Sequence, residues 1–213
     1  LVLEWFVQDG EQVAANTVLF SVTGNAQAIL TAERVALNFL QTMSATATET
    51  CKYVQLLAGS STRLLDTRKT LPNMRYAQKY AVQCGGGTNH RIGLADAFLI
   101  KENHIMACGG IAAAISTAKR IAPDKLVEVE VENMAELASA VSAGADIIML
   151  DNFTTKQVLQ AVEFTGQRAK LEVSGNITDT RITELKTTGV DFISTGAITK
   201  NIHAIDLSLR IIK

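Results

Sequence analysis

The stretch that decides the fold is LVEVEVENMAELASAVSAGADIIMLDN, residues 126–152. Its alternating and apolar runs predict strands at Leu126–Val131 and Ile147–Leu150. Between them, helical spacing of apolar residues predicts a helix over Met134–Ala143, and Gly144 suits the position after a helix end. A strand, a helix and a second strand of this length indicate a parallel pair joined by a right-handed crossover.

The same alternation extends from residue 63 to residue 194. Further strands are predicted at Arg63–Leu65, Ala97–Ile100, Leu171–Val173 and Phe192–Ser194, and further helices at Met74–Val82, Gly110–Ile121, Thr155–Thr165 and Asp179–Thr187. Each predicted strand is followed by polar, charged or glycine residues. In a parallel β/α barrel these strand ends meet on the face that carries the active site. An open doubly wound sheet also fits, although no GxGxxG follows the first strand, which disfavours a dinucleotide-binding sheet.

The N-terminal part differs in pattern. Residues 1–30 predict short strands with turns at Asp9-Gly10 and Gly24-Asn25, which are too little for an independent core. Thr31–Ala58 predicts a helix with a bend or break in its Ser- and Thr-rich part, residues 44–50. Because the chain starts at Leu1 in a strand-like run, we expect it to lack its natural N-terminus.

Composition excludes several classes of protein. Of the 213 residues 47% are hydrophobic and 19% charged, and the net charge is −1. With a pI near 6.4 there is no electrostatic case for nucleic acid or an anionic membrane. No uncharged apolar run approaches the roughly 20 residues that span a bilayer. Three cysteines without CxxC spacing suit a reducing compartment, so we expect a cytoplasmic protein without a structural zinc site.

Cations concentrate between Arg63 and His104, which hold seven of the 20 Lys and Arg residues. The segment also contains the glycine run 85–87 followed by His90 and Arg91. Glycines let backbone N–H groups approach an anion, and Arg matches carboxylate or phosphate in a bidentate manner. The pattern predicts a site for a multiply anionic small molecule, and a purely structural loop is the alternative.

Carboxylates follow on the next strands. In residues 127–132 valine and glutamate alternate, so Glu128, Glu130 and Glu132 share one face, either the barrel interior, where they would need cations, or a solvated face. Glu130 or Glu132 with Asp151 could hold Mg²⁺, especially beside substrate phosphates. The loops at 174–178 and 194–197 suit a phosphate, as in many barrels.

Together these motifs resemble quinolinate phosphoribosyltransferase, the carboxylating nicotinate-nucleotide pyrophosphorylase family. The resemblance is carried by TAERVALNFLQTMSATAT (31–48), LDTRKTLPNMRYAQKYAVQCGGGTNHRIGLADAFLIKENHI (65–105), EVEVEN (128–133), ADIIMLDN (145–152), LEVSGNIT (171–178) and GVDFISTGAIT (189–199). It implies an incomplete parallel β/α barrel (38–200) and a smaller α/β sandwich domain, whose remainder here is 1–37 with 201–213. It also implies phosphoribosyl transfer to quinolinate with decarboxylation, in NAD biosynthesis, by a homodimer or an assembly of dimers.

The resemblance also assigns roles to residues. Quinolinate carboxylates would meet Arg68, His90, Arg91 and Lys101, together with Arg34 contributed across the dimer. Phosphoribosyl pyrophosphate and its Mg²⁺ would be served by Thr67, Lys69, Glu130 and Asp151, with Lys69, Glu130 and Asp151 catalytic, and the 5′-phosphate by Ser174, Gly175 and Gly196. Asn176 and Lys200 depart from the family's usual Gly and His. The alternatives are a related barrel enzyme, or a non-catalytic binder of another phosphorylated or dicarboxylate metabolite.

Overall fold

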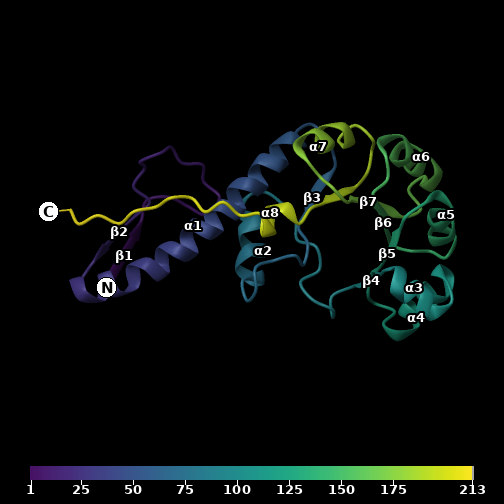
Figure 1. Cartoon of the computed structure of the whole chain (residues 1–213), viewed down its shortest axis with the longest axis horizontal. Helices are drawn as coiled ribbons and strands as arrows, with labels where there is room; N and C mark the ends of the chain where they lie inside the picture. Colours follow the sequence, from purple (N-terminus) through teal and green to yellow (C-terminus); the bar gives the residue numbers. More distant parts are fainter. Residues whose placement is uncertain (213) are drawn as a thin grey trace.

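A computed structural model describes residues 1–212 and shows a curved parallel sheet at one end of an elongated molecule (Figure 1). Its strands are β3 (Arg63–Leu65), β4 (Phe98–Ile100), β5 (Val127–Val131), β6 (Ile147–Asp151), β7 (Lys170–Ser174) and β8 (Phe192–Ser194). The sheet order is β3-β8-β7-β6-β5-β4, with every pair parallel. The first strand of this sheet pairs with the last one, while β3 and β4 are not paired. The sheet is therefore a barrel left open on one side, which confirms the predicted fold class.

Helices cover the outside of the curved sheet (Figure 1). They are α2 (Arg75–Cys84), α3 (Glu102–Cys108), α4 (Ile111–Ile121), α5 (Met134–Ser142), α6 (Thr155–Thr165), α7 (Asp179–Leu185) and the short α8 (Ala197–Lys200). The sequence had given no sign of α3. Its seven residues are too few to show a helical period, and none of them is buried.

The first helix, α1 (Ala26–Leu56), is continuous over 31 residues, so a break in residues 44–50, one of the two predicted alternatives, is wrong. The reason lies in its threonines. The hydroxyls of Thr42, Thr46 and Thr50 each donate to the carbonyl oxygen four residues earlier, which satisfies their polar groups inside the helix. The same helix crosses the predicted domain boundary at residue 37.

The two faces of the barrel strands differ in chemistry. Val127, Val129 and Val131 are fully buried against the helices in one apolar cluster that also holds Ile148 and Leu150. Packing of this layer supplies most of the hydrophobic stabilisation of the barrel. The alternate positions of the same strands face the barrel interior, and they include buried Glu128, Glu172 and Ser194.

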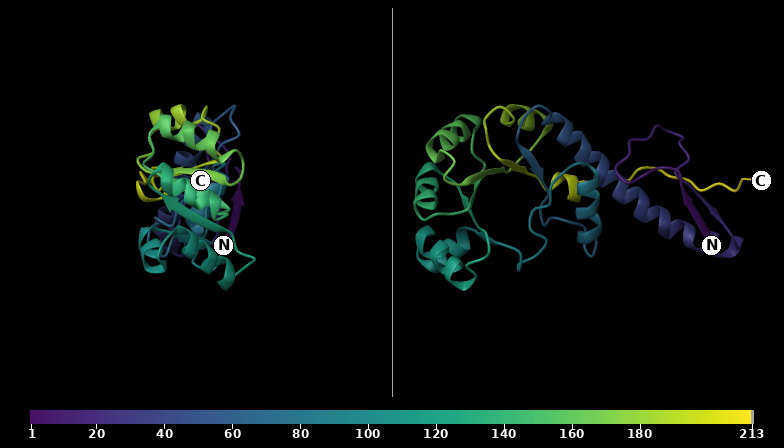
Figure 2. Two further views of the ribbon diagram at one scale, coloured as in Figure 1. Left: turned by 90° about the vertical axis from the view of Figure 1, so that its right-hand side faces the viewer. Right: turned by 180° about the vertical axis from the view of Figure 1, so that it is seen from behind.

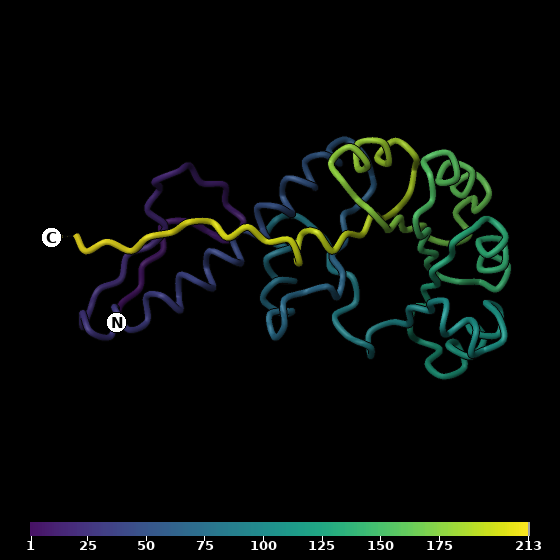
Figure 3. The backbone as a smooth tube through the Cα atoms, in the orientation of Figure 1, coloured from purple at the N-terminus to yellow at the C-terminus, as the bar shows by residue number. Residues whose placement is uncertain are grey.

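An arm extends away from the barrel (Figures 2 and 3). It consists of the antiparallel hairpin of β1 (Val2–Trp5) and β2 (Phe20–Thr23), the N-terminal half of α1, and residues 201–212, which run back alongside it. Ile205 N–H donates to the Gln41 carbonyl at 3.2 Å. The predicted small domain includes Lys213, which lies outside the described residues. Among residues 1–212 there is no helix of the length and apolarity that crossing a bilayer requires.

Candidate active site at the carboxyl ends of the barrel strands

The segment after β3 packs on the loop after β8. Lys69 N–H donates to the Thr67 hydroxyl at 3.0 Å, and the Thr199 hydroxyl donates to the Lys69 carbonyl at 2.7 Å. A Cβ added at Gly196 would lie 3.0 Å from Lys69 Cδ and 3.4 Å from the Thr67 hydroxyl oxygen. Three predicted site residues, Thr67, Lys69 and Gly196, therefore lie together. Position 196 favours glycine because the Lys69 side chain passes close over it. Lys200 is exposed at the end of α8.

Lys101 and Glu130, from the ends of β4 and β5, form an ion pair between Nζ and Oε2. Asp151 ends β6, beside β5 in the sheet, and its Oδ2 accepts from Asn152 Nδ2 at 2.8 Å. These oxygens on neighbouring strand ends are the hard donors that Mg²⁺ prefers, and both side chains are only partly buried, so water and phosphate can complete a coordination shell. The donor set therefore fits Mg²⁺, with Lys101 as a competing cation at Glu130.

His90 and Arg91 are held by a buried ion pair beneath them. Lys79 Nζ contacts Asp66 Oδ1 and donates to the His90 carbonyl at 2.7 Å. Asp66 also accepts from the His90 N–H at 2.8 Å and from Asn89 Nδ2 at 2.7 Å. Burial raises the pKa of the Asp66 carboxyl, and the contacts with Lys79 oppose this. Lys79 thus anchors the loop that carries two predicted site residues.

Three predicted cations near the strand ends have no carboxylate partner within residues 1–212: exposed Arg68 and Lys69, and partly buried Arg91. Burial, and then the charge of Arg68, lower the pKa of the Arg91 guanidinium. The two arginines are therefore close enough to repel one another. An anion between them would relieve that repulsion.

The interior of the barrel holds carboxylates that the sequence did not assign to the site. Glu128 and Glu172 are buried, and Glu128 Oε2 lies 2.8 Å from His90 Nε2. Within the described residues these three side chains are the one group of three His, Cys, Asp or Glu with the spacing of a metal site. Of the three alternating glutamates, Glu128 on β5 faces the interior, whereas Glu132 lies just past the end of β5 and is exposed. The sequence offers one sign that Glu172 is buried in the interior: it is an acidic residue between Leu171 and Val173, within a predicted strand that is otherwise apolar.

The glycine run at residues 85–87 is explained by close packing against α1, whereas the sequence predicted that it binds an anion. A Cβ at Gly85 would lie 2.4 Å from the Ala47 carbonyl oxygen of α1, and a Cβ at Gly87 would lie 2.8 Å from Thr50 Cγ2. These glycines are required because α1 packs directly on the loop. The expectation that they bring backbone N–H groups to an anion finds no support in this packing.

The loop after β7 has two residues in the left-handed region. Gly175 has φ +95°, and a Cβ there would lie 2.3 Å from Asn152 Oδ1. Asn176 has φ +47°, a conformation that Asn tolerates better than most residues. The departure from Gly at Asn176 is thus compatible with the loop. Ser174, at the end of β7, is partly buried beside them.

Arg34 lies far from these residues. It is exposed on the N-terminal half of α1, in the arm. From Arg34 to Tyr53, which is buried in the barrel core, the helix rises about 28 Å. The structure therefore does not bring Arg34 to the strand ends of its own chain.

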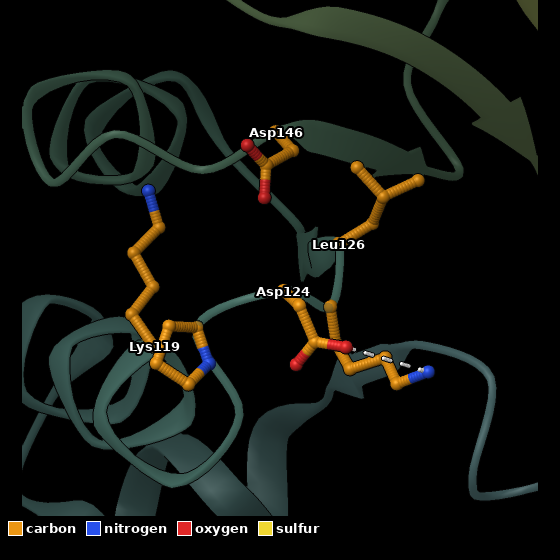
Figure 4. Close-up of a pocket in the computed structure, with 6 residues that line it drawn as sticks. Lys119, Asp124, Leu126 and Asp146 are labelled. Carbon is orange, nitrogen blue, oxygen red and sulfur yellow. Dashed lines mark ion pairs between the residues drawn. The ribbon is translucent and has the colours of Figure 1, made fainter.

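Two hollows on the surface of the described residues lie away from these side chains. One of about 320 Å³ is lined by Lys119, Asp124, Leu126 and Asp146 among others (Figure 4). Leu126 and Asp146 directly precede β5 and β6, so this hollow lies at the amino ends of the strands. Another of about 410 Å³ lies between the end of α1 and the start of β3. Neither contains a predicted site residue.

Comparison with known proteins gives concordant matches. Family models described as the C-terminal and N-terminal domains of quinolinate phosphoribosyl transferase match residues 46–210 and 1–44. The probable nicotinate-nucleotide pyrophosphorylase [carboxylating] of Synechocystis sp. is 43% identical over 209 residues, which cover 96% of this chain and 71% of the relative. Its counterpart in Bacillus subtilis is 41% identical, covering 95% and 70%. The solved structure of the nicotinate-nucleotide pyrophosphorylase from Francisella tularensis has a TM-score of 0.95 and 56% identity, covering 97% of this chain and 74% of that one.

Proposed function

Because this chain belongs to the quinolinate phosphoribosyltransferase family, we propose that it is a pentosyltransferase that joins quinolinate to the phosphoribosyl group of phosphoribosyl pyrophosphate. The pyridine nitrogen forms a bond to the anomeric carbon of ribose as the bond to pyrophosphate breaks. The carboxylate beside the nitrogen then leaves as CO₂, and a proton takes its place. The product is nicotinate mononucleotide, a precursor in NAD biosynthesis.

The observation that carries this proposal is the set of cations without carboxylate partners at the strand ends. Arg68 and Arg91 repel one another, and a dicarboxylate that pairs with both removes that cost. Lys69, packed over Gly196, supplies a positive charge beside the position expected for phosphoribosyl pyrophosphate. Electrostatic stabilisation of the departing pyrophosphate is then the main catalytic effect.

Glu130 and Asp151 would hold Mg²⁺ through their carboxylate oxygens. When bound, the ion neutralises pyrophosphate charge. Glu130 also forms an ion pair with Lys101. Lys101 is then shared between two tasks, as partner of Glu130 and as a cation for a quinolinate carboxylate. The Gly175 and Gly196 loops would receive the 5′-phosphate.

The chain would act as a homodimer or an assembly of dimers. Arg34 is too far along α1 to serve its own strand ends, so its proposed contact with quinolinate requires the site of a second copy. The arm that carries it also exposes large apolar side chains, including Leu3, Trp5, Phe6 and Phe39, each more than half exposed. An exposed apolar surface of this kind is typical of an interface.

The functional test compares Arg63, the first residue of β3, with Arg68, which lies three residues after its end. Arg68→Ala removes a cation at the carboxyl end of β3, whereas Arg63→Ala removes the same charge at the amino end. Loss of one charged hydrogen-bonding partner costs about 2–5 kcal/mol, so Arg68→Ala should weaken quinolinate binding by about 30-fold or more. Calorimetric titration with quinolinate measures this, and release of pyrophosphate and CO₂ measures turnover.

Arg63→Ala should bind quinolinate as the wild type does. Equal affinities of the two variants would remove Arg68 from the site. Quinolinate binding by the wild type without pyrophosphate release in the presence of phosphoribosyl pyrophosphate and Mg²⁺ would leave only a metabolite-binding protein.

The dimer is tested by subunit mixing. Arg34→Ala and Lys69→Ala should each be inactive alone, because each lacks a residue in every site. Mixed dimers restore one complete site in two, so activity should return to about half that of the wild type per mixed dimer. Activity that does not return on mixing would mean that Arg34 and Lys69 do not meet in one site across the dimer.

A further inference from the structure

The barrel interior contains two buried carboxylates, Glu128 and Glu172, beside the proposed site. Glu172 is 0% exposed, and neither of its carboxyl oxygens has a hydrogen-bond partner among the described residues. Its Oε2 lies 3.7 Å from His90 Nε2, to which Glu128 Oε2 is closer at 2.8 Å. Two ionised carboxylates at this separation and burial would repel strongly, so this group of three side chains must contain a compensating positive charge or a retained proton.

The hydrogen bonds of His90 decide where such a proton lies. Its Nδ1 accepts from the backbone N–H of Arg91 at 2.8 Å, so Nδ1 carries a lone pair and no proton. The ring proton is then on Nε2, where it is donated to Glu128. A metal ion is disfavoured for the same reason, because the lone pair it would need on Nε2 is occupied by that proton.

The titration behaviour of the group agrees with this assignment. Burial, and then the charge of Glu128, raise the pKa of the Glu172 carboxyl to about 8. Burial lowers the pKa of His90. The hydrogen bond and charge of Glu128 and the charge of Glu172 together raise this pKa by more than burial lowers it, so the net shift is upward. Both upward shifts express one proton that the group retains at neutral pH. The Arg91 contact at Nδ1 places that proton on Glu172 rather than on the ring.

We propose that Glu172 is a positioning residue that stays a neutral acid beside Glu128 and thereby fixes His90 in its Nε2–H form behind the dicarboxylate site. The proposal rests on the function proposed above. A neutral Glu172 limits the interior to one negative charge, which the nearby Arg91 can offset. Ionisation would add a second negative charge facing the same cation, and a dianion would bind less well.

The other groups around Glu172 do not supply this charge. From β8 the Ser194 hydroxyl faces it, and from β6 its partner in register is Met149, which carries no charge. The Lys79 ammonium acts on His90 from α2, but it is already paired with Asp66. Glu172 is therefore the side chain on which a single proton decides the net charge of the interior.

The test is the pH dependence of quinolinate binding. If only the enzyme with neutral Glu172 binds the dianion, the dissociation constant of the wild type should rise about tenfold between pH 7 and pH 9. Glu172→Gln keeps the shape of the neutral acid and cannot ionise, so its dissociation constant should not rise over this range. Glu163→Gln, an exposed acid on α6, should keep the wild-type rise. An equal rise in Glu172→Gln would overturn the proposal.

A second measurement does not depend on quinolinate. Glu172 has a raised pKa in the folded chain, so the folded state holds one more proton than the unfolded chain between about pH 4.5 and pH 8. The free energy of unfolding of the wild type should therefore contain a contribution that falls as pH rises through this window, and Glu172→Gln should lack it. Nitrogen-15 spectra of the three histidines should show His90 protonated at Nε2.

The two failures can be told apart. If the wild type does not bind quinolinate, the proposed function is wrong. The protonation of Glu172 would then still be tested by the unfolding profiles and the nitrogen-15 spectra. Protonation of His90 at Nδ1, or identical unfolding profiles for wild type and Glu172→Gln, would show that Glu172 does not hold the proton.

Discussion

The two faces of the barrel strands have opposite characters, although they alternate residue by residue along the same chain. On β5, Val127, Val129 and Val131 pack outward in a dry apolar layer. Glu128 and Glu130, between them, face inward among His90, Glu172 and Lys101. The outward face needs only volume and apolarity, and many residues satisfy that. The inward face depends on specific partners, because each buried charge is costly without its own partner.

The largest loss of stability should come from breaking the buried ion pair of Lys79 and Asp66. Lys79→Met leaves Asp66 buried with neutral donors only, and breaking a buried ion pair in this way costs about 3–5 kcal/mol. The loss should shrink as pH falls, since Asp66, whose pKa burial already raises, takes up a proton and becomes neutral. Urea unfolding followed by far-ultraviolet circular dichroism measures both effects.

Lys119→Met is the matched control, because Lys119 lies at the opposite end of the barrel, where its Nζ donates to the Gly144 carbonyl from an exposed position. A loss in Lys79→Met no greater than in this control would mean that the ion pair of Lys79 and Asp66 does not stabilise the fold. The double variant Asp66→Asn with Lys79→Met should recover part of the stability.

In the apolar layer, a substitution should change the free energy of unfolding through lost volume alone, and by somewhat less than Lys79→Met does. Ile148→Ala removes a fully buried side chain on β6 and should cost about 3 kcal/mol, through lost burial and a residual cavity. This loss should not vary with pH, unlike that of Lys79→Met. Leu126→Ala, at a residue that is 56% exposed, should change the free energy of unfolding by less than about 0.5 kcal/mol. A pH-dependent loss in Ile148→Ala would show that the two faces are coupled.

The repeating pattern predicted the barrel well, because alternating strands and helices follow from local periodicity and short-range connections. All six strands of the parallel sheet lie where the pattern places them, within one or two residues. Two local errors have local causes. The Ser- and Thr-rich part of α1 stays helical because its hydroxyls bond back to the helix, and α3 is too short and exposed to show a period.

The site was only partly predictable. In a barrel the functional residues follow the strands at their carboxyl ends. For this reason Lys69, Lys101, Glu130 and Asp151 could be predicted as candidate site residues from the sequence. The interior group was not, because a glutamate in a strand does not reveal which histidine lies across the barrel from it. His90 and Glu172 are 82 residues apart in the chain, and their contact depends on the curvature of the whole sheet.

The loop after α2 also has a consequence for how the molecule behaves among its neighbours. Thr88 forms a parallel bridge with Leu65, with hydrogen bonds from Thr88 N–H to the Leu64 carbonyl and from Asp66 N–H to the Thr88 carbonyl. A barrel that is open beside β3 would otherwise offer a bare strand edge for pairing with another chain. The glycines that let this loop lie under α1 thus give β3 a short substitute strand, and protect an incomplete barrel from edge-to-edge aggregation.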